Sequence, residues 1–125
     1  LDVDIETLMM VDSMEMSKTE RNYIIQKCIE EPVQQIVITH GTDTMVATAR
    51  MLADAVQDKT IVLTGAMIPV KFGSSDGLFN MGSALSFVQA LPPGVYIAMN
   101  GQIFNQENVK KNEKLGIFEE LELTL

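Results

Sequence analysis

The sequence predicts a doubly wound α/β domain, in which a mostly parallel sheet is covered by helices on both faces. Strand-like and helix-like patterns alternate along the chain. The strand-like runs are apolar on both sides, as in parallel sheets whose two faces are buried. The connections between them are long enough to hold crossover helices. The 125 residues fit one domain, which we expect to span residues 1–125.

The first part of the chain predicts a strand, a helix and a second strand. Apolar residues alternate with other residues from 3 to 11, which is typical of a strand. Ser17 and Glu20 have the spacing of a capping box, in which the Ser17 hydroxyl accepts from the Glu20 amide. Apolar residues follow at helical spacing, and they are Ile24, Ile25, Cys28 and Ile29. The Glu31-Pro32 pair ends this helix, and residues 33–39 predict the next strand.

The remainder of the chain continues the alternation. The predicted elements are helix 42–56, strand 61–64, helix 76–91 and strand 95–99. The side chains expected to face the sheet are Met45, Ala49, Leu52, Ala53 and Val56 from the first helix, and Leu78, Met81, Leu85 and Val88 from the second. Ile103-Phe104 predicts a short hairpin strand, while residues 116–125 show no clear period. Together these elements predict a three-layer, flavodoxin-like arrangement.

Composition excludes several classes of partner and site. The chain carries 17 acidic and 9 basic residues, a net charge of −8, and its largest basic run is Lys110-Lys111. Nucleic acids and anionic membranes need a concentrated basic surface, so we expect neither as a partner. One cysteine and one histidine exclude an internal disulfide and disfavour a metal site. No apolar run approaches the ~20 residues that span a bilayer.

Four loops follow directly after predicted strands. They are Asp12-Ser13, residues 40–43, Gly65-Ala66-Met67 and Asn100-Gly101. Ligands of open parallel sheets bind at the carboxyl ends of the strands, so we expect these loops to crowd one edge of the sheet. Three of the loops contain glycine, which lets the backbone approach a ligand closely.

The loop at residues 40–43 has the chemistry best suited to catalysis. Threonines 39, 42 and 44 surround Asp43 just before a predicted helix, whose N-terminus favours developing negative charge. A threonine hydroxyl becomes a nucleophile when a nearby base takes its proton, and a lysine with a lowered pKa can be that base. The alternative is that Thr42 or Asp43 only caps the helix.

Several motifs together resemble one enzyme family. They are the His-Gly-Thr-Asp-Thr run at 40–44 within residues 36–45, and residues 62–69, 75–80, 95–101 and 108–112. In this order they resemble the catalytic domain of bacterial-type L-asparaginases, and residues 111–119 are similar to short, single-domain members. The resemblance implies an amidohydrolase that converts L-asparagine to L-aspartate and ammonia through a threonyl acyl-enzyme, with no metal or organic cofactor.

The same resemblance assigns roles to individual residues. It implies a Thr-Lys-Asp triad of Thr42, Lys111 and Asp43, with Thr42 attacking the substrate or activating the attack. Asp43 would also hold the α-ammonium group of the substrate, and Ser13 matches a serine that binds the α-carboxylate. The implied substrate-binding residues are Ser13, Glu15, Gly41, Thr42, Asp43 and Ala66.

The resemblance also sets expectations about the rest of the protein. The family's first signature, a Thr-Gly-Gly-Thr turn after an opening strand, has no match, so we expect the first strand and the first nucleophilic threonine to be missing from this chain. The family implies a homo-oligomer, a dimer or larger. A single cysteine is compatible with a reducing compartment, and we expect a cytoplasmic protein. From loop position alone, amides near Gly41 and Gly65 are expected to stabilise the oxyanion.

Two other functions remain open. One is a non-catalytic module that binds an amino acid or serves assembly. The other is the glutaminase-type subunit of a tRNA-dependent amidotransferase, which shares these signatures. A nucleotide-binding domain is disfavoured, because no phosphate-cradling glycine motif follows a strand.

Several further residues are expected to have structural roles. His40 is interpreted as a hydrogen-bonded loop residue, because the family's chemistry uses lysine instead. Cys28 is expected to be inert on its apolar helix face, and methionines such as Met9, Met10 and Met81 are expected to fill the core. We expect Lys59 and Lys71 to be solvated, and residues 73–77 to form a loop that lines the site.

Overall fold

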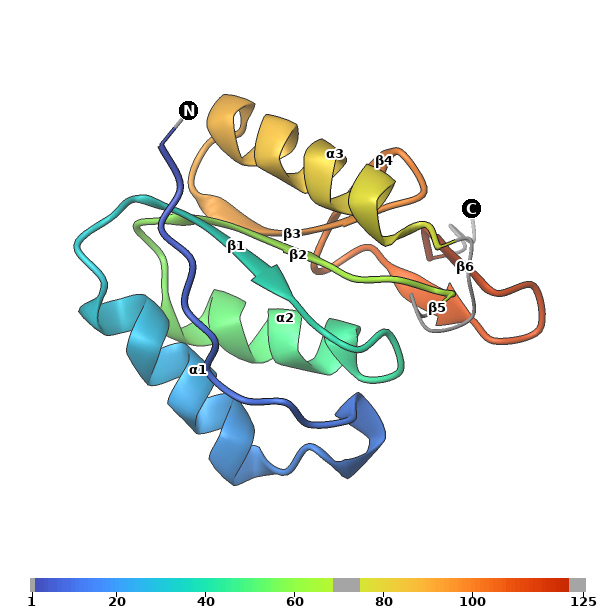
Figure 1. Ribbon diagram of the computed structural model, residues 1–125, viewed down its shortest axis with the longest axis horizontal. Coiled ribbons are helices and arrows are strands. Elements are labelled where there is room, and N and C mark those ends of the chain that lie inside the picture. Colours follow the sequence, from blue (N-terminus) through green and yellow to red (C-terminus); the bar gives the residue numbers. More distant parts are fainter. Residues whose placement is uncertain (1, 69–74, 122–125) are drawn as a thin grey trace.

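A computed structural model of the chain describes residues 2–68 and 75–121 and shows three layers (Figure 1). Its central sheet has the strand order β1-β2-β3-β4, and β5 and β6 form a separate two-stranded sheet. In chain order the elements are a short 3₁₀ helix η1 (Ser13–Glu15), α1 (Lys18–Glu30), β1 (Gln35–Thr39), α2 (Met45–Ala55), β2 (Thr60–Thr64), α3 (Gly77–Ala90), β3 (Gly94–Met99), β4 (Gln102–Asn105), β5 (Lys110–Asn112) and β6 (Ile117–Glu119). The predicted α/β class is confirmed.

The first three strands are parallel, as predicted. Val37 of β1 pairs with Val62 of β2, which pairs with Tyr96 of β3. β4 returns antiparallel to β3, with Phe104 opposite Ile97, and this confirms the predicted hairpin strand. The carboxyl ends of β1, β2 and β3 therefore meet at one edge of the sheet.

The two crossover connections of the parallel strands have opposite hands. α2 joins β1 to β2 and packs on the sheet face that presents Ile61 and Leu63. α3 joins β2 to β3 and packs on the other face, against Val62. Both connections step in the same direction across the sheet, so helices on opposite faces require one right-handed and one left-handed crossover. Left-handed crossovers are rare in parallel sheets.

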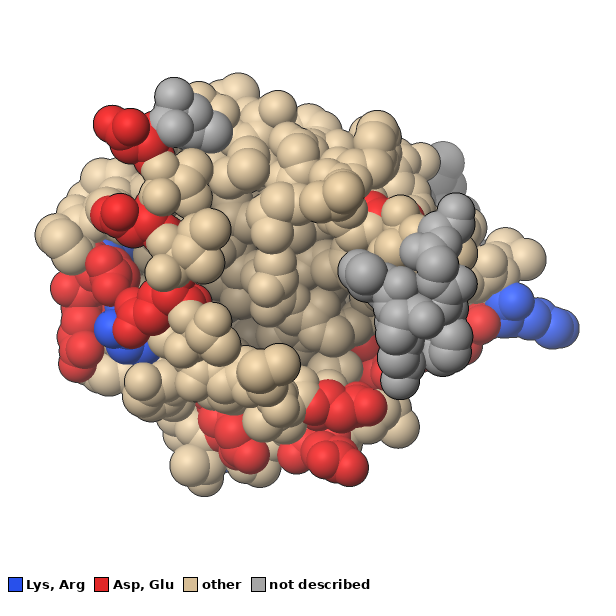
Figure 2. Space-filling view, viewed as in Figure 1, with Lys and Arg blue, Asp and Glu red and all other residues tan. Residues whose placement is uncertain are grey.

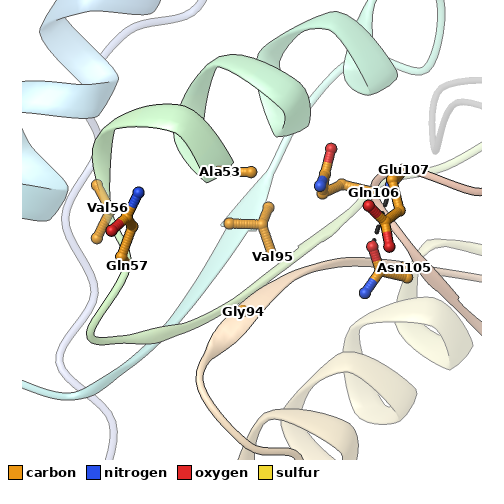
Figure 3. A pocket seen from close by; sticks show the side chains of 8 residues that line it. All are labelled: Ala53, Val56, Gln57, Gly94, Val95, Asn105, Gln106 and Glu107. Carbon is orange, nitrogen blue, oxygen red and sulfur yellow. Dashed lines mark hydrogen bonds between the residues drawn. The ribbon is translucent and has the colours of Figure 1, made fainter.

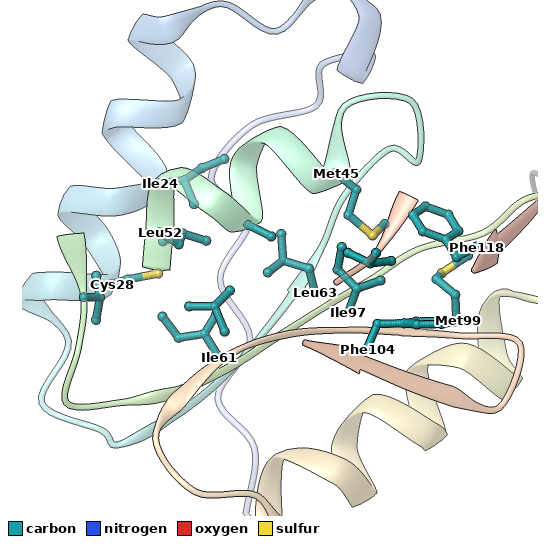
Figure 4. Packing of buried hydrophobic residues seen from close by; sticks show 14 residues of the cluster. Ile24, Cys28, Met45, Leu52, Ile61, Leu63, Ile97, Met99, Phe104 and Phe118 are labelled. Atoms are coloured by element: carbon teal, nitrogen blue, oxygen red, sulfur yellow. The ribbon is translucent and has the colours of Figure 1, made fainter. Parts of the chain in front are cut away.

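The larger part of the core lies between the sheet and the helices α1 and α2 (Figure 4). Its members include Ile24, Cys28, Met45, Leu52, Ile61, Leu63, Ile97, Met99, Phe104 and Phe118. A smaller cluster lies under α3 and consists of Val62, Ala84, Val88 and Ala98. Each fully buried aliphatic or methionine side chain stabilises the fold by roughly 1.5–3 kcal/mol. The predicted burial of Cys28 is confirmed.

The strand predicted over residues 3–11 is wrong. Residues 2–12 have no regular secondary structure, although their apolar residues alternate. Ile5 is 90% exposed and Met10 is 94% exposed, so the prediction that Met10 fills the core is also wrong. Only Leu8 and Met9 of this segment pack against the core. Alternation gives a strand only where a neighbouring strand supplies a hydrogen-bonded ladder.

Helix α1 lies where the sequence predicts it, but its capping box differs from the expected one. Ser17 occupies the N-cap position, and its side chain makes no hydrogen bond to a helix amide. Its hydroxyl donates to the Glu20 carboxylate instead, and this bond is the main cause of the lowered pKa of Glu20. The Ser17 hydroxyl thus binds the Glu20 carboxylate and not a helix amide, and the backbone amides of Glu20 and Ser17 also lower the pKa of that carboxyl.

Helix α3 is rotated relative to the predicted orientation. Leu78, which was expected to face the sheet, is 89% exposed. The residues that α3 buries are Asn80, Ala84 and Val88, while Met81 and Leu85 are half-buried. α3 contains no Asp, Glu, Lys or Arg, so its sequence has no charged face that fixes its orientation. Figure 2 shows the consequence, since the acidic side chains gather away from the uncharged surface over α3.

Two further expectations are corrected by the structure. Lys59 is only 5% exposed and is not solvated; its ammonium group donates to backbone carbonyls at the end of α1. The tail contains β6, which the sequence did not predict, and residues 122–125 lie outside the described residues. Lys71 also lies outside them. No helix within residues 2–68 and 75–121 is both long and apolar enough to cross a bilayer.

Candidate active site

The loops at the carboxyl ends of the parallel strands are joined to one another by hydrogen bonds. The amide of His40, just after β1, donates to the carbonyl of Thr64 at the end of β2 (2.8 Å). The amide of Asn100, just after β3, donates to the side chain of Asn80 (3.1 Å). The hairpin of β5 and β6 lies at the same edge of the molecule (Figure 1).

Lys111 of β5 contacts the loop that follows β1. Its Nζ atom donates to the Thr42 hydroxyl at 2.9 Å and to Oδ1 of Asp43 at 2.7 Å. Lys111 and Thr42 are 69 residues apart in the sequence, so only the fold brings them together. The side chain of Lys111 is 12% exposed and that of Asp43 is 37% exposed, which leaves the pair shielded on one side and open to solvent on the other. Glu113 approaches the same ammonium group at 3.6 Å.

The geometry of the hairpin places Lys111, and not the neighbouring lysines, against Thr42 and Asp43. Lys111 is paired across the hairpin with Phe118, which is buried in the core. Side chains alternate along a strand, so Lys110 points elsewhere, and it forms an ion pair with Glu119 (3.7 Å). The chain turns at Gly116, which has φ +66°, a conformation that favours glycine.

Neither Thr42 nor Asp43 acts as the cap of α2. The N-cap residue is Thr44, and its side chain makes no capping hydrogen bond. The Thr44 hydroxyl donates instead to the Ser13 carbonyl (2.9 Å), which ties the loop of η1 to the loop after β1. The side chains of Thr42 and Asp43 contact Lys111, an arrangement that helix capping does not require.

Ser13 lies beside the loop after β1, and Glu15 does not join it. Ser13 is 2% exposed, and its hydroxyl has no hydrogen-bond partner within the part of the chain that the structure describes. A Cβ atom at Gly41 would lie only 2.7 Å from the Ser13 side chain, so glycine is what allows this close approach. Glu15 is exposed, and its side chain makes no hydrogen bond or ion pair with any residue of 2–68 or 75–121.

The loop from Gly65 to Met67 is held by two polar residues at the start of α3, whose role the apolar pattern of the sequence did not reveal. Asn80 is fully buried and donates to the Gly65 carbonyl (2.8 Å). Asp76 accepts from the amides of Met67 and Ile68, both at 3.1 Å. An asparagine in the first turn of a helix without charged residues was the available signal, since an amide that becomes buried needs hydrogen-bond partners.

Both the loop geometry and the charge of Asp76 follow from these contacts. Burial by itself would raise the pKa of Asp76, but the amides of Ile68 and Met67, its own amide and the Asn80 side chain together lower it. A Cβ atom at Gly65 would lie 2.3 Å from the His40 carbonyl, so the loop can close up only with glycine here. Ala66, expected to contact substrate, is half-buried in this loop. Residues 73 and 74 of the expected site-lining loop lie outside the described residues.

His40 is a buried, hydrogen-bonded loop residue. It is 7% exposed, its Nδ1 lies 2.7 Å from the Gly41 carbonyl, and its Nε2 lies 2.8 Å from the Thr48 hydroxyl. Burial is the main cause of its lowered pKa, and the positive charge of Arg21 acts in the same direction. His40 is therefore held in its neutral form near neutral pH.

One hollow on the surface of the described residues lies elsewhere. It has a volume of about 250 Å³ and is lined by the end of α2, the start of β3 and the residues after β4 (Figure 3). Thr42 and Asp43 lie before the start of α2, at the opposite end of that helix. No group of three or more His, Cys, Asp or Glu side chains within residues 2–68 and 75–121 is arranged to hold a metal ion.

Comparison with known proteins identifies the family. The profile described as "Asparaginase, N-terminal" matches residues 1–119. The chain belongs to the asparaginase family. It is 39% identical over 84 residues to an L-asparaginase of Thermococcus kodakarensis, a match that covers 66% of this chain and 26% of that protein. It is 41% identical over 80 residues to one component of a glutamyl-tRNA(Gln) amidotransferase of Methanococcus vannielii, covering 63% of this chain and 19% of that component.

Solved structures of the asparaginase family share the fold. The thermostable L-asparaginase from Thermococcus kodakarensis superimposes with a TM-score of 0.81 at 30% sequence identity. The match covers 91% of this chain and 37% of that protein. This asparaginase-family chain therefore spans about a third of the length of the solved structure, and the similarity extends over nearly all of its own fold.

Proposed function

We propose that this chain is the catalytic α/β domain of an amidohydrolase that converts L-asparagine to L-aspartate and ammonia. The contact of Lys111 with both Thr42 and Asp43 is the observation that carries the proposal. A hydroxyl and a carboxylate that both lie within hydrogen-bond distance of one amine can serve as a nucleophile and as the group that orients its base. Membership of the asparaginase family supports amide hydrolysis as the reaction.

In the proposed reaction Thr42 is the nucleophile. Its hydroxyl attacks the side-chain amide carbon of asparagine, while Lys111, acting as a neutral amine, takes the proton across the 2.9 Å contact and becomes an ammonium group. The tetrahedral intermediate collapses with cleavage of the C–N bond, and the proton passes to the departing nitrogen, which leaves as ammonia. Water then attacks the threonyl ester, which releases aspartate and restores the Thr42 hydroxyl.

Asp43 has two tasks in this scheme. Its Oδ1 accepts from the Lys111 amine at 2.7 Å and orients it, and it stabilises the ammonium group that forms when Lys111 takes the proton. Its partly exposed carboxylate also holds the α-ammonium group of the substrate. The position of Thr42 and Asp43 just before α2 supports the reaction further, because the free amides of a helix N-terminus favour the negative charge that develops during attack.

The remaining expected contacts are proposed from position. The buried Ser13 hydroxyl, which has no partner among the described residues, is available to donate to the substrate α-carboxylate. The amides of Gly41, Gly65 and Ala66 border the same edge and are proposed to bind the substrate and the oxyanion. Glu15 has no contact that supports a role, and we assign it none. The scheme uses no metal or organic cofactor.

Ammonia release from L-asparagine by the purified full-length protein tests this proposal. Thr42→Val should lower kcat by on the order of 10³-fold or more, because it removes the nucleophile while keeping the side-chain shape. Lys111→Met should have a similar effect. Lys110→Met is the matched control, because Lys110 contacts Glu119 and not Thr42, and it should retain activity. Full activity of Thr42→Val would contradict the assignment.

The amidotransferase relative favours a second candidate, the glutaminase-type subunit of such an enzyme. Parallel assays with L-asparagine and L-glutamine distinguish the two, since the leading proposal requires a higher kcat/KM for asparagine. Binding of L-aspartate by calorimetry without turnover of either amide would favour the non-catalytic module. We also propose a cytoplasmic location, which the single, buried free thiol of Cys28 supports.

A further inference from the structure

A chain of hydrogen bonds connects α1 to the loop that carries Thr42. Arg21 of α1 donates from Nε to the Thr48 hydroxyl of α2 at 3.0 Å. The Thr48 hydroxyl contacts Nε2 of His40 at 2.8 Å, and Nδ1 of His40 contacts the Gly41 carbonyl at 2.7 Å. Thr48 is fully buried and His40 nearly so, which shields the connection from water.

The donors and acceptors in this chain fix the proton positions. A carbonyl only accepts, so the Nδ1 atom of His40 must carry the hydrogen that points to Gly41. In a neutral imidazole the other nitrogen, Nε2, is then an acceptor. A guanidinium only donates, so the Thr48 hydroxyl accepts from Arg21 and gives its own hydrogen to His40. The tautomer of His40 with hydrogen on Nδ1 satisfies every contact. The tautomer with hydrogen on Nε2 would place two acceptors, Nδ1 and the Gly41 carbonyl oxygen, against each other.

Arg21 also holds the loop on the other side of the site. Its Nη1 atom donates to the Met16 carbonyl at 3.1 Å, directly after η1. The Thr44 hydroxyl ties Ser13 of η1 to the loop after β1. Arg21 thus contacts the loop of Ser13 directly and the loop of Thr42 through Thr48 and His40.

We propose that Arg21, Thr48 and His40 are positioning residues, which fix the Gly41 carbonyl and thereby hold the Thr42 hydroxyl against Lys111. We call this chain of hydrogen bonds from Arg21 through Thr48 and His40 to Gly41 the relay. Its effect on the reaction rate rests on the function proposed above, whereas its effect on the position of Thr42 does not. Gly41 and Thr42 share a peptide unit, so a carbonyl held by His40 restricts the backbone from which the Thr42 side chain projects. Small displacements of a reacting group cost large factors in rate.

The first test is the tautomer of His40, read from a long-range ¹H–¹⁵N spectrum of the labelled chain. His40 is the only histidine, so its two ring nitrogens are assigned without ambiguity. The relay requires hydrogen on Nδ1 and a bare Nε2. A wild-type protein with hydrogen on Nε2, or with an even mixture of tautomers, would overturn the proposal.

The second test removes the hydroxyl of the relay in Thr48→Val. We expect the NMR signals of the Thr42 methyl and the Lys111 amine to shift, and kcat to fall about tenfold with little change in KM. Thr48→Ser keeps the hydroxyl and should restore both. Thr60→Val is the matched control, because Thr60 is also buried and its hydroxyl makes a hydrogen bond of its own, to the Leu91 carbonyl at the opposite end of the sheet. It should leave the Thr42 signal and kcat unchanged.

The two readouts separate failure of the relay from failure of the proposed function. If the wild type hydrolyses no amide, the proposed function is wrong, and the Thr42 and Lys111 signals alone decide the relay. If Thr48→Val leaves these signals and any turnover as they are in Thr60→Val, the relay is wrong. The relay is also wrong if Thr48→Val lowers only the stability of the protein. In that case the Thr42 signal does not shift, and Thr48→Ser has no shift to reverse.

Discussion

His40 shows how one side chain couples burial, charge and geometry. It is nearly buried, and the charge that acts on it is the guanidinium of Arg21. Burial and this like charge both disfavour the imidazolium, so the pKa lies below its ordinary value of 6.5. The neutral ring can then donate on one side and accept on the other, which its protonated form could not do.

This lowered pKa predicts a pH dependence of stability. Well above pH 6.5 His40 is neutral in both states and contributes no dependence. Below pH 6.5 the unfolded chain binds the proton more readily, so the free energy of unfolding should fall until the folded pKa is passed. Urea unfolding between about pH 5 and 8 gives the free energy of unfolding of the wild type and of His40→Asn, and the difference between the two isolates the contribution of His40. A difference that is flat or that grows toward acid pH would contradict the predicted direction.

Among the elements, α1 depends on a lysine from outside the helix. Lys59, between α2 and β2, donates to the carbonyls of Cys28 (2.6 Å) and Glu31 at the end of α1. The last carbonyls of a helix have no partner within it, and the negative end of the helix dipole attracts a cation.

Burial raises the pKa of the Cys28 thiol to about 11, which keeps that thiol protonated and unreactive.

Replacing Lys59 should therefore destabilise the protein through α1. Lys59→Met removes two charge-assisted hydrogen bonds and leaves the α1 carbonyls without a partner, partly offset by relief of the buried charge. We expect the free energy of unfolding to fall by about 2 kcal/mol in denaturant titrations. Lys27→Met is the control, because Lys27 forms surface ion pairs with Glu6 and Glu31, and its loss should change stability much less. Equal effects of the two substitutions would contradict the capping role.

At the scale of the whole molecule, the outer face of α3 is an exposed apolar surface. Leu78 is 89% exposed and Phe79 is 63% exposed on a helix without charges. The chain as a whole carries a net charge of −8, so two copies would repel each other at most other faces. An exposed, uncharged apolar face is typical of a contact with another protein. We therefore propose that copies of this chain associate through α3.

Sedimentation velocity tests this association. The wild type should sediment as a dimer or larger species, and Leu78→Glu should shift it toward the monomer, because the substitution places like charges in the contact. Ile5→Glu is the matched control, since Ile5 is 90% exposed on the extended N-terminal segment and should leave the mass unchanged. A monomeric wild type at all concentrations would refute the association.

Much of the fold could be predicted from local patterns, and the failures have identifiable causes. Helices α1 and α2 and strands β2 and β3 were predicted because apolar periodicity, Pro32 and β-branched runs act within a few residues. The segment 3–11 has the same alternation as a strand, but no strand of the described residues forms a ladder with it. In helix α3 the predicted burial of Val88 is confirmed, but Leu78 is exposed and Asn80 is buried, because a pattern that considers only apolar residues ignores Asn80.

The candidate site, too, could be predicted only in part from the sequence. The sequence by itself determined the order of the elements, the parallel sheet and the loops at its carboxyl edge, because these follow from local periodicity and from the chain direction. Only the tertiary structure decided that Lys111 meets Thr42 and Asp43, that Lys59 is buried and that His40 links Gly41 to Thr48. These contacts join elements far apart in the chain, and their geometry depends on how helices and hairpin pack against the sheet. Packing of that kind is a property of the whole core and of no single segment.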